Sequence, residues 1–427
     1  MEVIVVGGGI AGLAASYRLL RAGVRVTLLE STGQLGGLGT FFRRGDRFID
    51  RFYHCTMPTD QVLLALVQQL GLHDQYIWRE TTMGMIVQGA HYNFSTPLDL
   101  LRYKPLSVLQ RLWLGAGALC MRHLGQKTDL NRISAEAWLT SIYGKTLWQQ
   151  VWFPLLRAKF GDRAGSVPAR YIWQRAGREG NKSRRGYPAC GYYGLIAALQ
   201  NAIVSMGGRI YFGEPVRRIR ECGTCMLVDT ETDCQVTERK ADAVISTLPL
   251  PLLKPMLDGH LCRDLQLPNL NYQGVVNALF FMQRGLKGHY WTPVIDDVTG
   301  FDGVVEMSTL VDRTHFGGLH LAYTMRYTHR DDALFCTPSD QIAANWTRQL
   351  LRLYPELRSA DIVEVLIFKA PYVEPIWPLN YTAPSIRVKH HRLFLASAAQ
   401  VYPQVTSWNA SVGLANTAAD ALLEALE

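Results

Sequence analysis

The sequence predicts an α/β fold in which a Rossmann-like dinucleotide-binding domain carries an inserted domain of antiparallel sheet and helices. Three patterns predict it. Residues 3–6 are a short apolar run followed at once by three glycines and a helical stretch, as in a buried parallel strand that leads into a helix. Further apolar runs of strand length recur at 24–29, 243–246 and 393–396. Residues 272–330 alternate apolar and polar side chains, which indicates an antiparallel sheet.

The other elements follow from the same periodicities. A helix is expected at 10–22, ended by Gly23, and residues 80–190 have mostly helical patterns. Pro371, Pro375 and Pro378 are expected to break the chain after a strand at 363–368. The remaining expected elements are helices at 61–70, 194–206, 340–354 and 411–426, and strands at 209–212, at 216–219 and on to about 238.

Composition and charge limit the class of protein and its partners. The chain of 427 residues is 48% hydrophobic and 19% charged, which is ordinary for a globular protein of two or three domains. Its formal charge of +8 favours anionic partners. Nine Lys and Arg residues lie between Arg157 and Arg185, either as a solvated basic face or as an anion-binding site. No nucleic-acid-binding motif surrounds them, so we expect no nucleic-acid partner.

Cysteine usage and hydropathy indicate the compartment. Eight scattered cysteines without a secretory leader favour free thiols in a reducing cytoplasm. Cys222 and Cys225 form a CxxC pattern that fits a hairpin, and no second pair completes a zinc site, so no metal is expected. The apolar stretch Leu106–Leu124 predicts a buried helix, and the alternative is a helix that dips into a membrane surface. We expect a cytoplasmic protein without a transmembrane helix, with peripheral membrane contact as the alternative; no pattern indicates an oligomeric state.

A glycine-rich loop carries the clearest functional signal. GxGxxG lies between a predicted strand and a predicted helix, the context that a dinucleotide site requires. Gly7 permits the tight turn, Gly9 lets a diphosphate approach the backbone, and Gly12 lets the helix pack closely on the strands. The helix N-terminus at Ile10 and Ala11 offers free N–H groups and a partial positive charge to that diphosphate.

An acid and a second glycine pair specify the dinucleotide. Glu30 lies 18 residues beyond Gly12, where a carboxylate can accept the ribose hydroxyls, and Gly36 and Gly37 follow soon after. The order strand, GxGxxGL, helix, Gly, strand, Glu, GG resembles the FAD fingerprint of the flavin amine oxidase superfamily. That superfamily includes monoamine oxidases, protoporphyrinogen oxidase and phytoene desaturases. The resemblance implies an FAD cofactor.

The resemblance also implies roles for residues outside the loop. Leu38 replaces an Arg that often follows the glycine pair, and Arg43 or Arg44 is expected to supply that charge. Val216 begins a strand whose counterpart meets the adenine. Residues 397–400 replace the usual Gly-Asp, whose Asp accepts ribityl hydroxyls, as in members similar to protoporphyrinogen oxidase and UDP-galactopyranose mutase. The expected replacements at the flavin end are Gln400, Ser407 and Asn409.

By the same resemblance, FAD is bound non-covalently, because no cysteine lies in the context that links the flavin. Residues 1–80, 200–262 and 376–427 are expected to form the FAD-binding domain. Residues 81–199 and 263–375 are expected to form the substrate-binding domain, with its helical part.

Candidate catalytic and substrate-binding residues come from segments that the superfamily brings near the flavin. His54 is a candidate acid, base or flavin contact, and a structural histidine bonded to the backbone is the slightly favoured alternative. Lys369 is a candidate counterpart of the lysine that some amine oxidases have near flavin N5. Tyr372 is a third catalytic candidate. Trp377 and Tyr381 are candidate walls for an apolar or planar substrate, with core packing as the alternative.

Arg157 and Lys159 are candidates for clamping an anionic substrate group, with ordinary surface charges as the alternative. The leading hypothesis is an FAD-dependent oxidoreductase that removes a hydride from a largely apolar substrate that can also be anionic or lipid-like, such as an isoprenoid or a tetrapyrrole. The second hypothesis is a redox-neutral flavin-dependent isomerase or mutase. The third is a dinucleotide-binding protein without catalytic activity.

Overall fold

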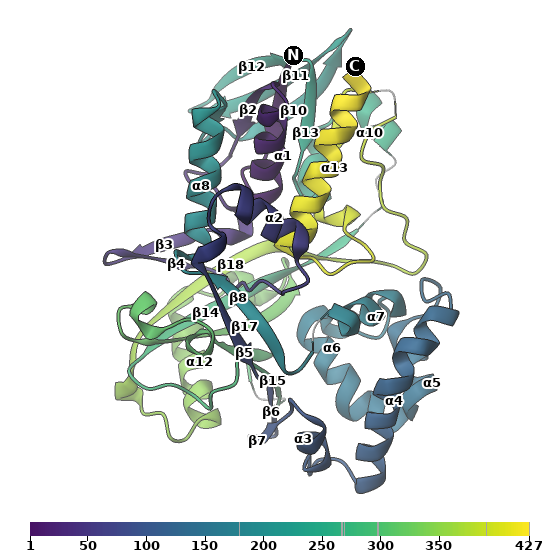
Figure 1. The fold of residues 1–427 in the computed structure, drawn as a ribbon, viewed down its shortest axis with the longest axis vertical. Coiled ribbons are helices and arrows are strands. Elements are labelled where there is room, and N and C mark those ends of the chain that lie inside the picture. The colour runs from purple at the N-terminus through teal and green to yellow at the C-terminus, as the bar shows by residue number, and fades with distance from the viewer. Residues whose placement is uncertain (179, 266–267, 269, 297–298, 390, 427) are drawn as a thin grey trace.

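The structure is a computed structural model that describes residues 1–178, 180–265, 268, 270–296, 299–389 and 391–426. A parallel sheet and both chain termini lie at one end of the molecule, and a group of helices lies at the other (Figure 1). A seven-stranded, mostly antiparallel sheet lies beside these helices, on the left below the parallel sheet in this view. The predicted fold class, a Rossmann-like domain with an inserted sheet-and-helix domain, is confirmed.

Five strands form the parallel sheet that carries the glycine loop. They are β1 (Glu2–Val6), β2 (Arg25–Leu29), β9 (Arg209–Tyr211), β13 (Ala243–Ser246) and β19 (Leu393–Leu395), in the spatial order β19-β13-β1-β2-β9. Every neighbouring pair is parallel, and Val5 lies between Leu28 and Ile245. The strands expected from the sequence are therefore confirmed to within one residue.

Different elements cover the two faces of this sheet. Val3 and Val5 pack against α1 (Ile10–Arg21), α8 (Gly191–Ser205) and α13 (Trp408–Leu426). Ile4 and Val6 pack against a three-stranded sheet of β10 (Val216–Cys222), β11 (Cys225–Thr232) and β12 (Gln235–Ala241). Successive strand residues point to opposite faces, so a strand covered on both sides must be apolar throughout. Cys222 and Cys225 pair across the β10–β11 turn, which confirms the predicted hairpin.

The seven-stranded sheet has the order β18-β14-β17-β16-β15-β6-β7. Its strands are β6 (Gly84–Val87), β7 (Ala90–Asn93), β14 (Asn271–Met282), β15 (Trp291–Ile295), β16 (Gly303–Glu306), β17 (His320–His329) and β18 (Ile362–Ile376), and α12 (Ser339–Leu353) packs on one face. The prediction that Pro371 and Pro375 break the chain is wrong, because β18 runs through both. It lies at the edge of the sheet, where a residue without an N–H leaves no partner unsatisfied.

Residues 80–190 are helical only in their middle. The helices are α3 (Pro97–Leu101), α4 (Val108–Lys127), α5 (Ala135–Leu147), α6 (Phe153–Phe160) and α7 (Ala169–Arg178). Strands flank them, since β6 and β7 precede α3, and β5 (Tyr76–Thr81) pairs with β8 (Ser183–Pro188). The remaining elements are α2 (Gln61–Gln69), β3 (Phe41–Arg44), β4 (Arg47–Asp50), α9 (Leu250–Leu253), α10 (Gly259–Leu265) and α11 (Ala333–Cys336).

The apolar helix α4 is not buried as predicted. Val108, Leu109, Leu112 and Trp113 are exposed, and Leu109 is 78% accessible. A helix that is apolar on all sides predicts burial on both faces, but within the described part of the chain only one face of α4 packs against other elements. Among the described residues, none of the helices is both long enough and apolar enough to span a bilayer.

Candidate functional site

The glycine loop joins β1 to α1 and leaves open space at one residue. Gly7 has φ +103°, and a Cβ there would lie 2.6 Å from Thr247 Oγ1. A Cβ on Gly12 would overlap the carbonyl oxygen of Gly7. Gly9 differs from both, because it caps α1 with an extended backbone, and the atom nearest to its Cβ position is Gly37 Cα at 3.9 Å. The space needed for a diphosphate therefore lies at Gly9.

The second glycine pair closes the other side of this space. The Gly36 N–H donates to the carbonyl oxygen of Gly8 at 2.9 Å, and Gly9 and Gly36 form a parallel bridge. Gly36 and Gly37 have φ values of 120° and 57°, a region that favours glycine. Residues 7–12 together with Gly36 and Gly37 form what we call the glycine cradle.

The glycine cradle fits the diphosphate of a dinucleotide. No side chain caps the N-terminus of α1, and its first turn, with Ile10 and Ala11, contains no acid. The first N–H groups of a helix have no partner within the helix, and with the helix dipole they bind phosphate oxygens.

Glu30 lies at the end of β2, beside the cradle, and is buried. Its Oε2 accepts a hydrogen bond from the Gly8 N–H at 2.8 Å. Its Oε1 accepts hydrogen bonds from the Thr32 N–H at 2.9 Å and the Thr32 hydroxyl at 2.8 Å. A carboxylate has about four lone-pair sites, so Oε2 keeps the capacity to accept a ribose hydroxyl.

The two arginines expected to replace the missing Arg are engaged in other contacts. Arg43 is exposed, and its Nε donates to the Gly45 carbonyl in its own hairpin at 2.9 Å. The Arg44 Nε lies 2.7 Å from Glu364 on β18, and its guanidinium stacks over Phe281. Neither contact is with the cradle, so the structure does not support Arg43 or Arg44 as diphosphate ligands. Val216 is buried where β10 begins, beneath the parallel sheet.

The Gln400 side chain is hydrogen-bonded to main-chain groups of the protein. Its Oε1 accepts from the Ser397 N–H at 2.9 Å, and its Nε2 donates to the carbonyls of Pro384 and Ser385 at 3.2 and 3.3 Å. The amide is thus used in positioning the chain after β19. These contacts do not support the expectation that Gln400 replaces the ribityl-binding Asp.

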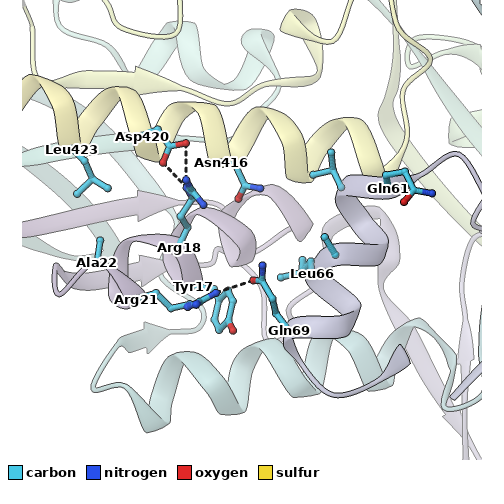
Figure 2. A pocket seen from close by; sticks show the side chains of 12 residues that line it. Tyr17, Arg18, Arg21, Ala22, Gln61, Leu66, Gln69, Asn416, Asp420 and Leu423 are labelled. Carbon is cyan, nitrogen blue, oxygen red and sulfur yellow. Dashed lines mark hydrogen bonds and ion pairs between the residues drawn. The ribbon is translucent and has the colours of Figure 1, made fainter. Parts of the chain in front are cut away.

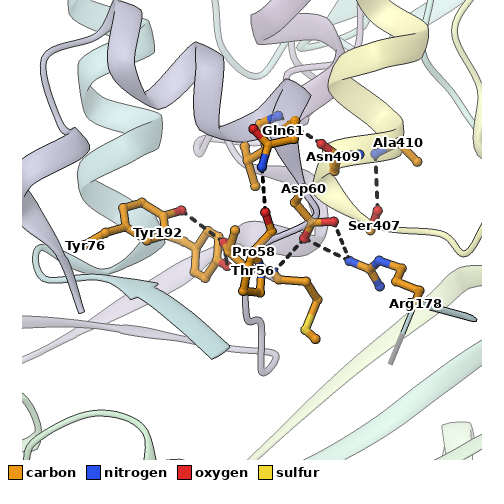
Figure 3. A network of polar contacts seen from close by, with 12 residues as sticks. Thr56, Pro58, Asp60, Gln61, Tyr76, Arg178, Tyr192, Ser407, Asn409 and Ala410 are labelled. Atoms are coloured by element: carbon orange, nitrogen blue, oxygen red, sulfur yellow. Dashed lines mark hydrogen bonds and ion pairs between the residues drawn. The ribbon is translucent and has the colours of Figure 1, made fainter. Parts of the chain in front are cut away.

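Ser407 and Asn409 lie where α13 begins. The Ser407 Oγ accepts from the Ala410 N–H at 3.2 Å, and the Asn409 Oδ1 accepts from the Leu63 N–H of α2 at 3.0 Å (Figure 3). Between them, the Trp408 ring packs on Gly39, a residue just after the cradle. The start of α13 is therefore brought to the same end of the parallel sheet as the cradle.

His54 lies among aromatic rings at this end. Its ring centroid is 5.3 Å from that of Tyr192 and 5.6 Å from that of Trp408. Its Nδ1 is 2.8 Å from the Phe52 carbonyl oxygen. Because a carbonyl only accepts, Nδ1 carries the proton, and Nε2 is left as an acceptor. Burial lowers the pKa of His54 to about 4, so the ring is neutral at physiological pH.

Asp50 is a buried acid that the sequence did not single out as a site residue. The Tyr187 hydroxyl donates to its Oδ2 at 2.6 Å, and the Tyr323 hydroxyl donates to its main-chain carbonyl at 2.8 Å. Burial raises the pKa of Asp50 to about 7, because desolvation disfavours the charged form. Tyr187 is 137 residues from Asp50 in the chain, so no local pattern could have revealed the pair.

The structure directs Lys369 and Tyr372 away from His54. The Lys369 ammonium donates to the carbonyls of Phe335 and Thr337 at 2.9 and 2.6 Å. These carbonyls lie at the end of α11, so Lys369 acts as a helix cap and is not supported as a catalytic lysine. The Tyr372 hydroxyl accepts a hydrogen bond from the exposed Arg330, which places it at the surface.

The proposed anion clamp is not formed. Arg157 is about half exposed and lies 3.8 Å from Asp162. Lys159 lies 3.3 Å from the buried Glu374 of β18, whose other oxygen accepts from the Tyr171 hydroxyl. Each cation therefore faces a protein carboxylate. This result corrects the expectation that the two act together on a substrate anion.

Trp377 and Tyr381 belong to the core of the helical group. The Trp377 ring lies 5.2 Å from Tyr171 and 5.5 Å from Tyr402, and only 2% of Trp377 is exposed. The Tyr381 hydroxyl donates to the Ala399 carbonyl at 2.9 Å. The core-packing alternative accounts for both residues better than a substrate wall does.

Two pockets lie beside α13. One, of about 600 Å³, lies between the start of α13 and the ends of α4 and α7, and Ser407, Asn409 and Gln126 are among its lining residues. Asp60, which also lines it, is buried and accepts hydrogen bonds from Arg178 at 2.9 Å (Figure 3). The other, of about 570 Å³, lies between α1, α2 and α13 and is crossed by the Arg18–Asp420 ion pair (Figure 2).

Comparison with known proteins decides the family. A sequence model of flavin-containing amine oxidoreductases matches residues 10–406. The chain belongs to the flavin-containing amine oxidoreductase family. The prediction of an FAD-dependent oxidoreductase is thereby confirmed at the level of the family. FAD is the cofactor, held non-covalently, and residues 396–413 contain no cysteine.

Individual relatives of this flavin-containing amine oxidoreductase are distant. Amine oxidase [flavin-containing] B of Sus scrofa is 32% identical over 115 residues, which are 26% of this chain and only 22% of that enzyme. The match thus spans about a fifth of the relative's length. A protein from Exiguobacterium sp. 255-15, provisionally named a protoporphyrinogen oxidase, has a TM-score of 0.78 at 17% identity, with 99% of both chains covered. Cyclohexylamine oxidase from Brevibacterium oxydans has a TM-score of 0.75 at 14% identity, covering 100% of this chain and 99% of its own.

Proposed function

We propose that this family member is an FAD-dependent oxidoreductase that removes a hydride from a largely apolar substrate. The observation that carries the proposal is the open space at Gly9, which the second glycine pair frames and Glu30 borders. When bound, FAD supplies the acceptor for a hydride taken from a substrate C–H bond. The protein then has to hold the cofactor, enclose the reacting atoms and position the substrate.

The glycine cradle and the start of α13 are the proposed holders of the cofactor. Gly9, Ile10 and Ala11 present backbone to the diphosphate, and Glu30 accepts a ribose hydroxyl. The strand that begins at Val216 lies toward the adenine. Ser407 and Asn409 are retained as the residues nearest the ribityl chain, because they line a pocket at the N-terminus of a long helix. In this proposal, residues 1–80, 200–262 and 376–427 bind FAD, and residues 81–199 and 263–375 bind the substrate.

His54 is the proposed polar contact of the reacting region. A neutral ring whose Nδ1–H is held by the Phe52 carbonyl presents Nε2 as a fixed hydrogen-bond acceptor. Tyr192 and Trp408 surround the ring and limit the access of water. Aromatic surroundings suit a substrate with a large apolar or planar part. Because Arg157 and Lys159 face protein carboxylates, the proposal contains no anion clamp.

The test begins with an absorption spectrum of the purified chain. Bound oxidised flavin is expected to give bands near ~375 and ~450 nm. The protein is then mixed without oxygen with a primary alkylamine, a porphyrinogen and a saturated isoprenoid. We expect one of these classes to bleach the flavin stoichiometrically. A protein that needs prior flavin reduction and isomerises a sugar nucleotide without net electron transfer would overturn the proposal, as would one that binds no flavin.

A further inference from the structure

The outward face of α4 is the largest concentration of exposed apolar side chains in the described structure. Eight of the seventeen exposed large hydrophobic residues lie within residues 98–124. Six of them are on α4, and we call these six the α4 face: Val108, Leu109, Leu112, Trp113, Leu119 and Leu124. Leu98 and Leu101 on α3 are the other two.

The inner face of α4 shows why the outer one is free. Gly117 and Gly125 let neighbouring rings approach so closely that a Cβ would overlap Tyr143 of α5 or Trp173 of α7. Leu114 and Met121 are buried on the same side, at helical spacing with these glycines. The helix is thus anchored by close packing on one side. Its opposite side has no protein partner in the described structure, and Leu109 and Leu119 are each 78% exposed.

Trp113 is exposed, but its only polar side-chain group is hydrogen-bonded within the protein. Its indole N–H donates to the Ile142 carbonyl at 3.0 Å, while 57% of the residue remains exposed. Burying an indole in hydrocarbon is costly only when its N–H loses its partner. Here the partner is supplied by the protein, so the exposed part of the ring can enter an apolar phase without that penalty.

The charged residues around the α4 face are mostly basic. Residues 97–127 contain five Lys and Arg residues and a single acid, Asp99. Arg102 and Lys104 precede the helix, Lys127 ends it, and all three are exposed. A helix with an apolar face and basic flanks binds anionic lipid, because the apolar side chains enter the acyl boundary and the cations remain at the headgroups.

We propose that the α4 face docks the protein on the surface of an anionic lipid bilayer. The face belongs to a single helix at the end of the molecule remote from α1 and the termini (Figure 1), and its six side chains are exposed. A second copy of this chain would bring the same basic flanks together, which like-charge repulsion opposes. The proposal is independent of the activity proposed above.

The last turn of α4 also contributes to a pocket. Gln126, in the last turn of α4, lines the pocket of about 600 Å³ that Ser407 and Asn409 share. Both the pocket and the docking surface thus involve the same helix.

Vesicle flotation of the FAD-loaded full chain tests the proposal. We expect the protein to float with vesicles of phosphatidylcholine and phosphatidylglycerol, and to bind pure phosphatidylcholine at least about ten-fold more weakly. The double variant Leu109→Glu/Leu112→Glu should reduce binding to the anionic vesicles by at least about ten-fold, because it loses apolar burial and gains repulsion. Leu119→Glu, at the other end of the face, should act in the same direction.

The matched control is Val204→Glu/Val236→Glu, which changes two exposed valines outside α4 in the same way. It should bind vesicles like the wild type, and equal flavin content in all variants shows that the fold is intact. If the double variant floats like the wild type, or the wild type does not float at all, the proposal is overturned. It is also overturned if the wild type is a dimer by light scattering that the α4 substitutions dissociate while vesicle binding is absent.

Discussion

The Glu30 carboxylate accepts a hydrogen bond of 2.8 Å from the backbone N–H of Gly8, which ties the end of β2 to the glycine loop at the end of β1. The acid therefore positions the loop, in addition to the ribose contact proposed for it. We expect Glu30→Ala to weaken FAD binding by about ten-fold to a hundred-fold, the effect of losing one or two hydrogen bonds to a charged group. Titration of the apo protein with FAD, followed by flavin fluorescence, measures the change.

Asp46→Ala is the control, because the Asp46 side chain is 85% exposed on the hairpin. It should bind FAD like the wild type. Unchanged affinity in Glu30→Ala would contradict the ribose-binding role.

Gly9→Ala separates cofactor binding from folding. Gly9 has an extended, negative-φ backbone, and its Cβ position has no neighbour closer than 3.9 Å, so alanine fits the empty protein. The new methyl group occupies the space proposed for the diphosphate. We expect FAD binding to be lost, while the free energy of unfolding of the apo protein changes by less than about 0.5 kcal/mol.

Gly12→Ala provides the contrast, since its Cβ would overlap the Gly7 carbonyl and should destabilise the apo protein itself. Denaturant unfolding of both apo variants distinguishes the two effects. Full FAD binding by Gly9→Ala would show that the diphosphate lies elsewhere.

The buried carboxyl of Asp50 should make stability fall as pH rises. Its pKa is about 7 in the folded protein against 3.8 when exposed, so between pH 4 and 7 the folded state keeps a proton that the unfolded state loses. The contribution of Asp50 to the free energy of unfolding therefore decreases over this window, by a few kcal/mol at most, or about 1.4 kcal/mol per pKa unit. Asp50→Asn should become more stable relative to the wild type as pH rises from 4 to 7, as measured by urea unfolding. A difference that does not change with pH would contradict the raised pKa.

His54 should produce the opposite slope. Its pKa falls from 6.5 to about 4 on folding, so between these values the unfolded state binds a proton that the folded state does not. The stability contributed by neutral His54 is present above pH 6.5 and is lost as pH falls toward 4. Relative to His54→Asn, the wild type should lose stability across this range on acidification. The two slopes offset each other in the wild type, so the single variants are needed to reveal them.

Lys369→Met tests the role of the lysine that sequence resemblance suggested as catalytic. Its ammonium bonds two carbonyls at the end of α11, so we expect a loss of about 1–2 kcal/mol in the free energy of unfolding. The rate of flavin reduction by substrate should stay within about two-fold of the wild type. A hundred-fold slower flavin reduction in a folded variant would show that Lys369 acts at the reacting centre. Stopped-flow absorbance at the flavin band measures this rate.

The cradle could be predicted from sequence because its determinants are local. A run of apolar residues, a positive φ at Gly7 and an acid at a fixed distance encode the strand, the turn and the proposed ribose contact within about 35 residues. The parallel partners of β1 were found for a similar reason, since strands covered on both faces are apolar along their whole length.

Side-chain partners were predicted less well, because they come from distant parts of the chain. Lys369 and Phe368 are neighbours on β18, and the pleat sends them to opposite faces. Phe368 meets Phe42 beside the FAD-binding part, and Lys369 meets the end of α11. A shift of one residue in register would exchange them.

By itself, the sequence determined the glycine cradle, the parallel sheet, the family and its cofactor. Tertiary structure decided that Gln400 holds its own loop, that Glu374 neutralises Lys159, and that α4 turns an apolar face outward. The physical reason is the range of the interactions. Backbone conformation and hydrophobic period depend on neighbours in sequence. Charge pairing and exposure depend instead on how elements from distant parts of the chain pack together.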